Sequence, residues 1–304
     1  MTFKIDGIVG ALRSARGASA RTVDRNGNVL ELPSPRDLSE IVAGLISSLF
    51  PRRYGGARAA MNGALDYFVG FTLDKALEGL STQVVRELVF TAALAGREVN
   101  DAESASRDIV QNFADRLPAI LEILYSDVRA AYDGDPSAKS QEEVLLSYPG
   151  IKAVVHHRIA HVLYKLDLPI IARIVAESSH SATGIDIHPG AEIGPSFFID
   201  HGTGVEIGET AVIGERVRLY QAVTLGAKRF SVDESGALVK GLPRHPIVED
   251  DVVVYAGATI LGRVTIGRGS TIGGNVWLTR SVPPNSNIVQ AQARSDTFDG
   301  GAGI

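Results

Sequence analysis

The first half of the chain has the hydrophobic spacing of α-helices. Apolar residues recur at helical intervals in several segments that are rich in Ala, Leu, Val and Glu, the residues that favour helix. The expected helices are residues 37–49, 57–94, 102–132, 151–166 and 169–177. Pro118 should kink or split the third of these. Residues 14–30 are polar and contain two glycines, so they are expected to form a loop or a frayed arm.

The second half has a six-residue period instead. A helix does not keep such a period, and a half-buried strand alternates every two residues. A six-residue repeat is typical of a parallel β-helix, in which each repeat forms one short flat face of a coil. The alternative, a β-sandwich with evenly spaced turns, would not keep the period for so long. The apolar positions that carry it are Ile187, Ile193, Ile199, Ile207, Ile213, Leu219, Leu225, Val248, Val254, Ile260, Ile266, Ile272 and Leu278.

The first three of these positions are offset from the rest by two residues, and one later step is far too long. Leu225 and Val248 are 23 residues apart, so about residues 228–243 must leave the coil as a protruding loop. Loops on rigid scaffolds often carry binding groups. From the spacing alone, a surface insertion without a function is equally open.

Composition narrows the class of protein. The 304 residues are enough for two domains, and 45% hydrophobic with 21% charged residues is ordinary for a globular chain. A net charge of −5 gives no sign of a general nucleic-acid binder. The absence of cysteine excludes disulfides, thiolate metal ligands and a cysteine nucleophile. We expect a cytoplasmic protein, because neither a signal-peptide pattern nor a membrane-length apolar run is present.

Several motifs are more specific than the repeat. They are DGDP at 133–136, GIDIHPG at 184–190, IDHGTG at 199–204, QAVTLG at 221–226 and RHP at 244–246. Over about residues 133–285 the chain resembles the bacterial and plant serine O-acetyltransferases, which are hexapeptide-repeat acyltransferases. The resemblance, to a subgroup with an extended helical domain, implies an α+β fold. It places an all-helical N-terminal domain at 1–180, a left-handed parallel β-helix with the protruding loop at 181–288, and a flexible tail at 289–304.

The resemblance implies acetyl transfer from acetyl-CoA to the hydroxyl of L-serine, which gives O-acetyl-L-serine for cysteine biosynthesis. A neutral alcohol is a poor nucleophile near pH 7, and histidine, with an ordinary pKa of about 6.5, is a suitable base. His201 is the candidate base. Asp186 lies 15 residues earlier, close to one turn of three repeats, so stacked turns could bring its carboxylate to the other ring nitrogen. Without the resemblance, such a pair would be read as a surface hydrogen bond.

The substrate is a zwitterion, and each of its charges needs a partner. By resemblance, Asp135 and Asp200 bind the ammonium, and Arg244 and His245 bind the carboxylate. On their own, Asp135 could be a turn residue before Pro136 and Arg244 a solvated loop charge.

Acetyl-CoA would lie between the coils of neighbouring subunits, against backbone groups of Thr224, Gly226, Gly257 and Ala258. We expect direct transfer, because the chain has neither a cysteine nor a Gly-x-Ser-x-Gly elbow. We also expect that the reaction needs no metal. Trp277 would be a packing residue of the last turn. The chain departs from the family in its longer loop and in its last turn, where Ala291-Gln-Ala-Arg294 replaces the usual ending.

The last expectations concern the oligomeric state and the C-terminal tail. The resemblance implies a trimer or a dimer of trimers, and docking of the terminal Ile304 on O-acetylserine sulfhydrylase (cysteine synthase), although composition alone favours a frayed terminus. Three other functions stay open: acetylation of a sugar or antibiotic, a β-helical carbonic anhydrase, and a catalytically silent scaffold that regulates the sulfhydrylase. The carbonic anhydrase, with three histidine ligands, would need a His-x4-His pair within the coil, which His188, His201 and His245 do not supply.

Overall fold

The computed structural model describes residues 5–18, 29–55, 64–229 and 232–290. The chain divides into two compact units. The first consists of residues 1–117 with 166–174, and the second of residues 118–165 with 175–304. None of the helices in the described ranges has both the length and the apolarity of a bilayer span.

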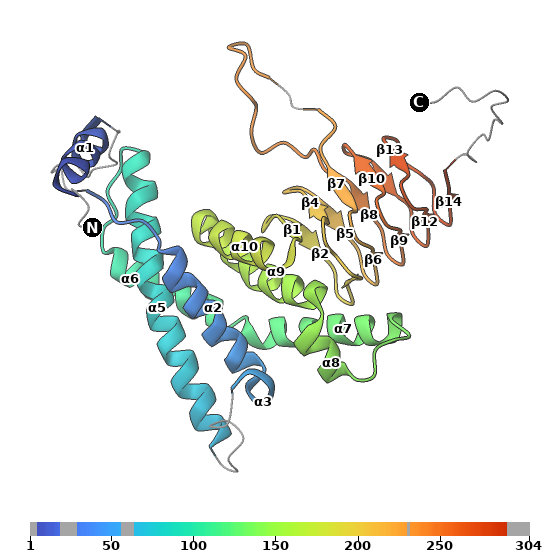
Figure 1. The fold of residues 1–304 in the computed structure, drawn as a ribbon, viewed down its shortest axis with the longest axis horizontal. Helices are drawn as coiled ribbons and strands as arrows, with labels where there is room; N and C mark the ends of the chain where they lie inside the picture. The colour runs from blue at the N-terminus through green and yellow to red at the C-terminus, as the bar shows by residue number, and fades with distance from the viewer. Residues whose placement is uncertain (1–4, 19–28, 56–63, 230–231, 291–304) are drawn as a thin grey trace. The chain divides into compact units, whose positions relative to one another are not determined.

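The first unit is helical (Figure 1). Its helices are α1 (Ile5–Ala18), α2 (Pro35–Leu49), α3 (Pro51–Tyr54), α5 (Leu65–Leu94) and α6 (Ala102–Ala114). Helix α2 begins after Ser34, whose side chain accepts a hydrogen bond from the Asp37 N–H, with a proline in the first turn. Its apolar stripe, which includes Leu38 and Leu45, is buried, and α2 packs on α5. Residues 14–18, expected to be a loop, are helical, so that prediction was wrong.

The second unit contains α7 (Leu117–Gly134), α8 (Gln141–Ser147), α9 (Pro149–Lys165) and the C-terminal half of α10 (Pro169–Thr183). The break between α6 and α7 confirms that the segment around Pro118 is split. Helix α8 was not expected. It is capped by Ser140, which accepts a hydrogen bond from the Glu143 N–H at 3.1 Å.

The remaining chain is the left-handed parallel β-helix that the period predicted (Figure 1). Every third strand pairs in parallel, which gives three sheets, in the orders β1-β4-β7-β10-β13, β2-β5-β8-β11 and β3-β6-β9-β12-β14. The strands are β1 (Asp186–Ile187), β2 (Glu192–Ile193), β3 (Phe198–Ile199), β4 (Glu206–Ile207), β5 (Val212–Ile213), β6 (Arg218–Leu219), β7 (Thr224–Gly226), β8 (Ile247–Val248), β9 (Val253–Val254), β10 (Thr259–Leu261), β11 (Thr265–Ile266), β12 (Thr271–Ile272), β13 (Trp277–Leu278) and β14 (Asn287–Ile288).

The register of strand pairing confirms the protruding loop that was expected at about residues 228–243. Glu206 pairs with Thr224, 18 residues later, whereas Thr224 pairs with Thr259, 35 residues later. The extra residues lie between β7 and β8, outside the coil. The thirteen apolar positions of the repeat are buried except Ile193, which is half-buried. The packing role expected of Trp277 was wrong, because its side chain is 71% exposed on the outer face of its sheet.

A buried ion pair joins the helices of the second unit to the coil. Asp127 of α7 binds Arg158 of α9 through both carboxylate oxygens, at 3.1 Å each. The Arg158 guanidinium also donates to the carbonyls of Ile193 and Gly194, and Asp127 accepts the Phe197 N–H at 2.8 Å. Burial raises the pKa of Asp127, and the Arg158 charge opposes that rise. The pair therefore has nearly all its hydrogen-bonding capacity in use.

We predict that Asp127→Asn destabilises the second unit strongly, by about 3–5 kcal/mol, because it leaves the Arg158 charge buried without a counter-ion. Glu122→Gln, an exposed carboxylate on the same helix, is the matched control and should change stability by less than about 0.5 kcal/mol. Urea unfolding of the three proteins measures both effects. Equal stability of Asp127→Asn and the wild type would contradict this account.

Candidate active site

The predicted site residues of the coil lie on two of its edges. The chain turns from the third sheet to the first at what we call the His201 edge, residues 200–205, 220–223 and 255–258. It turns from the first sheet to the second at the Arg244 edge, residues 188–191, 208–211, 227–229, 232–246 and 262–264. Within one chain the strands of the first sheet separate the two edges.

His201 stands at the surface of its edge. Its backbone is left-handed, with φ of 60°, a conformation that corners of this kind require. The side chain is 71% exposed, and Nε2 lies 3.7 Å from Oδ1 of Asp200. The Asp200 side chain is only 9% exposed, and its Oδ2 accepts a hydrogen bond from Arg218 at 2.5 Å. The imidazole is thus open to a substrate on one side and faces a buried carboxylate on the other.

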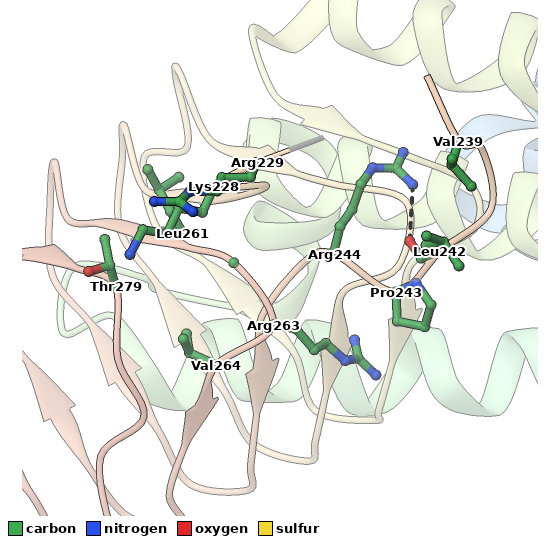
Figure 2. A pocket seen from close by; sticks show the side chains of 11 residues that line it. Lys228, Arg229, Val239, Leu242, Pro243, Arg244, Leu261, Arg263, Val264 and Thr279 are labelled. Atoms are coloured by element: carbon green, nitrogen blue, oxygen red, sulfur yellow. Dashed lines mark hydrogen bonds between the residues drawn. The ribbon is translucent and has the colours of Figure 1, made fainter. Parts of the chain in front are cut away.

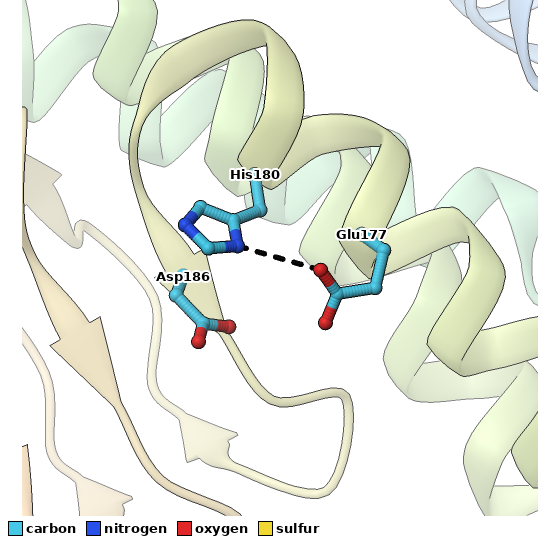
Figure 3. Close-up of side chains that lie close together, drawn as sticks. All are labelled: Glu177, His180 and Asp186. Atoms are coloured by element: carbon cyan, nitrogen blue, oxygen red, sulfur yellow. Dashed lines mark hydrogen bonds and ion pairs between the residues drawn. The ribbon is translucent and has the colours of Figure 1, made fainter.

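Asp186 lies in the neighbouring turn, where the Gly184 carbonyl accepts the Gly204 N–H at 2.7 Å. No hydrogen bond or ion pair between the Asp186 and His201 side chains occurs in the described structure. Asp186 instead faces His180 and Glu177 at the end of α10, and the ligand atoms of the three lie within 4.8 Å of one another (Figure 3). Such a trio could hold a divalent cation. The Asp186–His201 hydrogen bond stays a prediction.

Asp135 belongs to the same cluster as Asp200. It follows α7, and its Oδ2 accepts the Tyr148 hydroxyl at 2.5 Å, while Oδ1 accepts the Ser137 N–H and hydroxyl at 2.8 Å each. The hydrogen bond from Tyr148, together with those from Ser137 and the Arg218 charge, lowers the pKa of Asp135. The Arg218 guanidinium is paired with Asp200, and it acts on Asp135 only through its charge, as the smallest of these causes. Neither Arg218 nor Tyr148 was predicted from the sequence as a residue of this site.

Arg244 and His245 lie together at the other edge. Arg244 binds Glu209 at 2.6 Å, and Glu209 also accepts the Tyr164 hydroxyl at 3.1 Å. Burial raises the pKa of Glu209, but the hydrogen bonds from Arg244 and Tyr164 outweigh it and lower that pKa overall. Thr210 connects the pair, since its hydroxyl accepts the N–H groups of both Arg244 and His245.

His245 is a neutral imidazole. Burial, reinforced by the Arg244 charge, lowers the pKa of His245 to about 4. Its Nδ1 accepts the Thr210 N–H at 3.0 Å, so the ring proton is on Nε2. A substrate carboxylate at this edge would meet one guanidinium and one neutral N–H donor, rather than two cations.

A cavity of about 330 Å³ opens at the Arg244 edge under the protruding loop (Figure 2). Four cations line it: Lys228, Arg229, Arg244 and Arg263. Arg263 donates to the carbonyls of Thr210 and His245, and Arg244 is paired with Glu209. Lys228 and Arg229 form no ion pair with any residue that the structure describes. This cavity therefore has the charge to attract an anion, and two of its four cations have no ion-pair partner among the described residues.

The four residues expected to contact acetyl-CoA lie along the first sheet and the His201 edge. Thr224 and Gly226 belong to β7, and Gly257 turns the chain with φ of 72°. Ala258 is completely buried, so its contact with a cofactor stays a prediction. Ile304 lies outside the described residues, and its docking stays a prediction.

Comparisons with known proteins agree with this fold. Residues 245–280 match the family model of the bacterial transferase hexapeptide (six repeats). The serine acetyltransferase, plasmid, of Synechococcus elongatus is 56% identical over 306 aligned residues, which cover 100% of this chain and 96% of that protein. A serine acetyltransferase of Bacillus licheniformis is 45% identical over 173 residues, 57% of this chain and 76% of that protein.

Solved structures show the same relationship. Serine acetyltransferase 1 of Entamoeba histolytica in complex with L-cysteine matches with a TM-score of 0.72 and 33% identity, covering 93% of this chain and 97% of that one. Serine acetyltransferase of Brucella abortus in complex with coenzyme A matches with a TM-score of 0.55 and 27% identity, covering 85% and 94%.

Coil, repeat and protruding loop together define a hexapeptide-repeat transferase. Within that class, the chain belongs to the serine acetyltransferase family.

We predict that His245 makes the folded protein acid-sensitive. Its pKa is about 4 in the fold and about 6.5 when unfolded, so the unfolded chain alone takes up a proton as the pH falls through that interval. The stability that His245 contributes is complete above about pH 6.5. It falls by about 2 kcal/mol between about pH 7.5 and about pH 5.

His245→Asn keeps an acceptor for the Thr210 N–H and removes the titrating ring. The variant should lose less stability than the wild type over this pH interval in urea unfolding. His157, whose pKa burial also lowers well below its usual value, acts in both proteins and cancels in the comparison. An identical pH dependence in the two proteins would contradict the assignment.

Proposed function

We propose that the protein transfers the acetyl group of acetyl-CoA to the hydroxyl of L-serine, with His201 as general base. The observation that carries the proposal is the exposed His201 imidazole beside a buried Asp200, in a chain of the serine acetyltransferase family. In the cytoplasm the product, O-acetyl-L-serine, would enter cysteine biosynthesis. There the terminal Ile304 would dock on O-acetylserine sulfhydrylase.

The reaction is a direct transfer. Neutral His201 takes the proton of the serine hydroxyl as the oxygen attacks the thioester carbonyl. The tetrahedral intermediate then expels the CoA thiolate, which takes the proton back from the imidazolium. One carbon–oxygen bond forms, one carbon–sulfur bond breaks, and the products are O-acetyl-L-serine and CoA. Asp186 would steady the imidazolium if it accepted a hydrogen bond from Nδ1.

Two chains would supply each site. The ammonium and carboxylate of serine are attached to one carbon, whereas the His201 and Arg244 edges stand one face of the coil apart, roughly 15 Å or more for six residues. Asp135 and Asp200 would therefore bind the ammonium in one copy, while Arg244 and His245 of a neighbouring copy bind the carboxylate. A closed ring of three copies makes every such pair equivalent, and a dimer of trimers preserves it.

The cationic cavity at the Arg244 edge suits acetyl-CoA. Lys228 and Arg229 offer free charges for its phosphates, and Thr224 and Gly226 lie in the strand that leads to this edge. A coenzyme A complex of the Brucella abortus relative supports the choice of cofactor. The backbone of Gly257 and Ala258, at the His201 edge, would contact the cofactor from the neighbouring copy.

We predict that His201→Ala lowers the turnover number by about a hundredfold or more, because the serine hydroxyl loses its base. The assay is thiol release from acetyl-CoA with L-serine, with a galactoside, and with no acceptor. His156→Ala is the control and should retain activity, since among the described residues that ring bonds only to the Lys152 carbonyl of its own helix. Wild-type release that does not depend on serine would refute the proposed reaction.

A mixing experiment tests the two-chain site. Co-expression of His201→Ala with Arg244→Ala should restore activity, because about one quarter of the sites then join two intact edges. Co-expression of His201→Ala with Asp200→Asn, both on one edge, restores none. If the first mixture is as inactive as the second, each chain forms its site alone.

A further inference from the structure

Arg218 lies close to the His201 edge but has no role in the reaction proposed above. It lies in β6, paired in register with Phe198 of β3, and its side chain is 24% exposed. The guanidinium is placed between two aromatic rings, 4.9 Å from the Phe198 centroid and 4.6 Å from that of Tyr220. Tyr220 in turn stacks on Tyr255, with centroids 5.0 Å apart. These rings restrict the guanidinium to one place beside the His201 edge.

The charge partner of Arg218 is Asp200. Nη2 donates to Oδ2 at 2.5 Å, which leaves Oδ1 directed toward Nε2 of His201 at 3.7 Å. The two carboxylate oxygens of Asp200 thus have different surroundings. Oδ2 is hydrogen-bonded to Arg218, and Oδ1 faces the place where the substrate must react. Without this anchor, the Asp200 carboxylate could rotate away from His201.

The Arg218 guanidinium also leaves one donor unused. Its Nε is buried and makes no hydrogen bond with any residue of the described structure. Buried donors of arginine are nearly always paired. The position of Arg218 is therefore set by Asp200 and by the two rings, and not by the needs of its own hydrogen bonds.

The net charge of Asp135, Asp200 and Arg218 suggests what this arrangement binds. Asp135 and Asp200 carry two negative charges, and Arg218 carries one positive charge that acts on both. The sum of −1 matches the single ammonium of an amino acid. Without Arg218, two carboxylates would repel each other whenever the site is empty, and Asp200 would be a buried charge without a counter-ion.

We propose that Arg218 is a positioning residue for serine. It holds Asp200 in one rotamer, so that Oδ1 can accept the substrate ammonium next to His201. The inference rests on the proposed serine acetylation, and it adds a determinant of acceptor binding from a strand that contributes none of the predicted site residues.

The test compares Arg218→Leu, which removes the charge, with Arg218→Lys, which keeps it. Arg268→Leu is the matched control, because Arg268 forms a similar ion pair with Asp250 but is 63% exposed on a different edge of the coil. Steady-state kinetics with each substrate varied, serine binding by calorimetry and a thermal melt are recorded for every protein.

For Arg218→Leu we expect the KM for serine to rise about tenfold or more and serine affinity to fall equally, with the KM for acetyl-CoA unchanged. Arg218→Lys should lie between Arg218→Leu and the wild type, and Arg268→Leu should match the wild type.

Two results would overturn the inference. One is a wild-type KM for serine in Arg218→Leu. The other is an equal loss for both substrates with a lowered melting temperature, which a purely structural role would give. An active wild type with either result leaves the proposed function intact. A wild type that neither binds nor acetylates serine rejects both proposals.

Discussion

The structure depends on parallel pairing between successive turns of the coil. Each turn closes after three six-residue repeats, and burial of the inward apolar residue of every repeat sets the register. A slip of one residue would turn those side chains out to water. Because the register is fixed, residues from successive turns form columns along each edge. Asp200, Tyr220 and Tyr255 are such a column, since each directly follows a strand of the third sheet. The site combines such columns with two pairs of sequence neighbours, Asp200 with His201 and Arg244 with His245.

The sequence period was sufficient for the coil and insufficient for the surface of the site. Each inward residue is specified by its own repeat, so the turns and the protruding loop could be predicted from spacing alone. The role of Arg218 could not, because an arginine on the outer face of a strand usually points to solvent. Its environment depends on Phe198 one turn earlier and on the segment after α7, which approaches from outside the repeat. The packing role predicted for Trp277 was wrong because an aromatic residue in the last turn suggested burial, whereas its side chain occupies an outward position.

The two edges differ in a way that suits a zwitterion. The His201 edge presents two carboxylates against one guanidinium, and the Arg244 edge presents cations around a cavity. The neutral state of His245 limits the positive charge there, since a second cation beside Arg244 would have to be buried with it. His245 therefore adds direction, through a single N–H, rather than charge. Orientation of serine would come from the asymmetry of the two edges.

Two Asp–Arg pairs in the second unit show how such asymmetry arises. In Asp127–Arg158, three guanidinium nitrogens and both carboxylate oxygens are satisfied, and the pair connects helices to the coil. In Asp200–Arg218, one oxygen lacks a close partner and Nε is unpaired. A buried ion pair is weak evidence for stability even when complete, because desolvation offsets the attraction. An incomplete pair stabilises still less, so its presence at the His201 edge is better explained by a ligand that completes it. The ammonium of serine has the charge and the donors to do so.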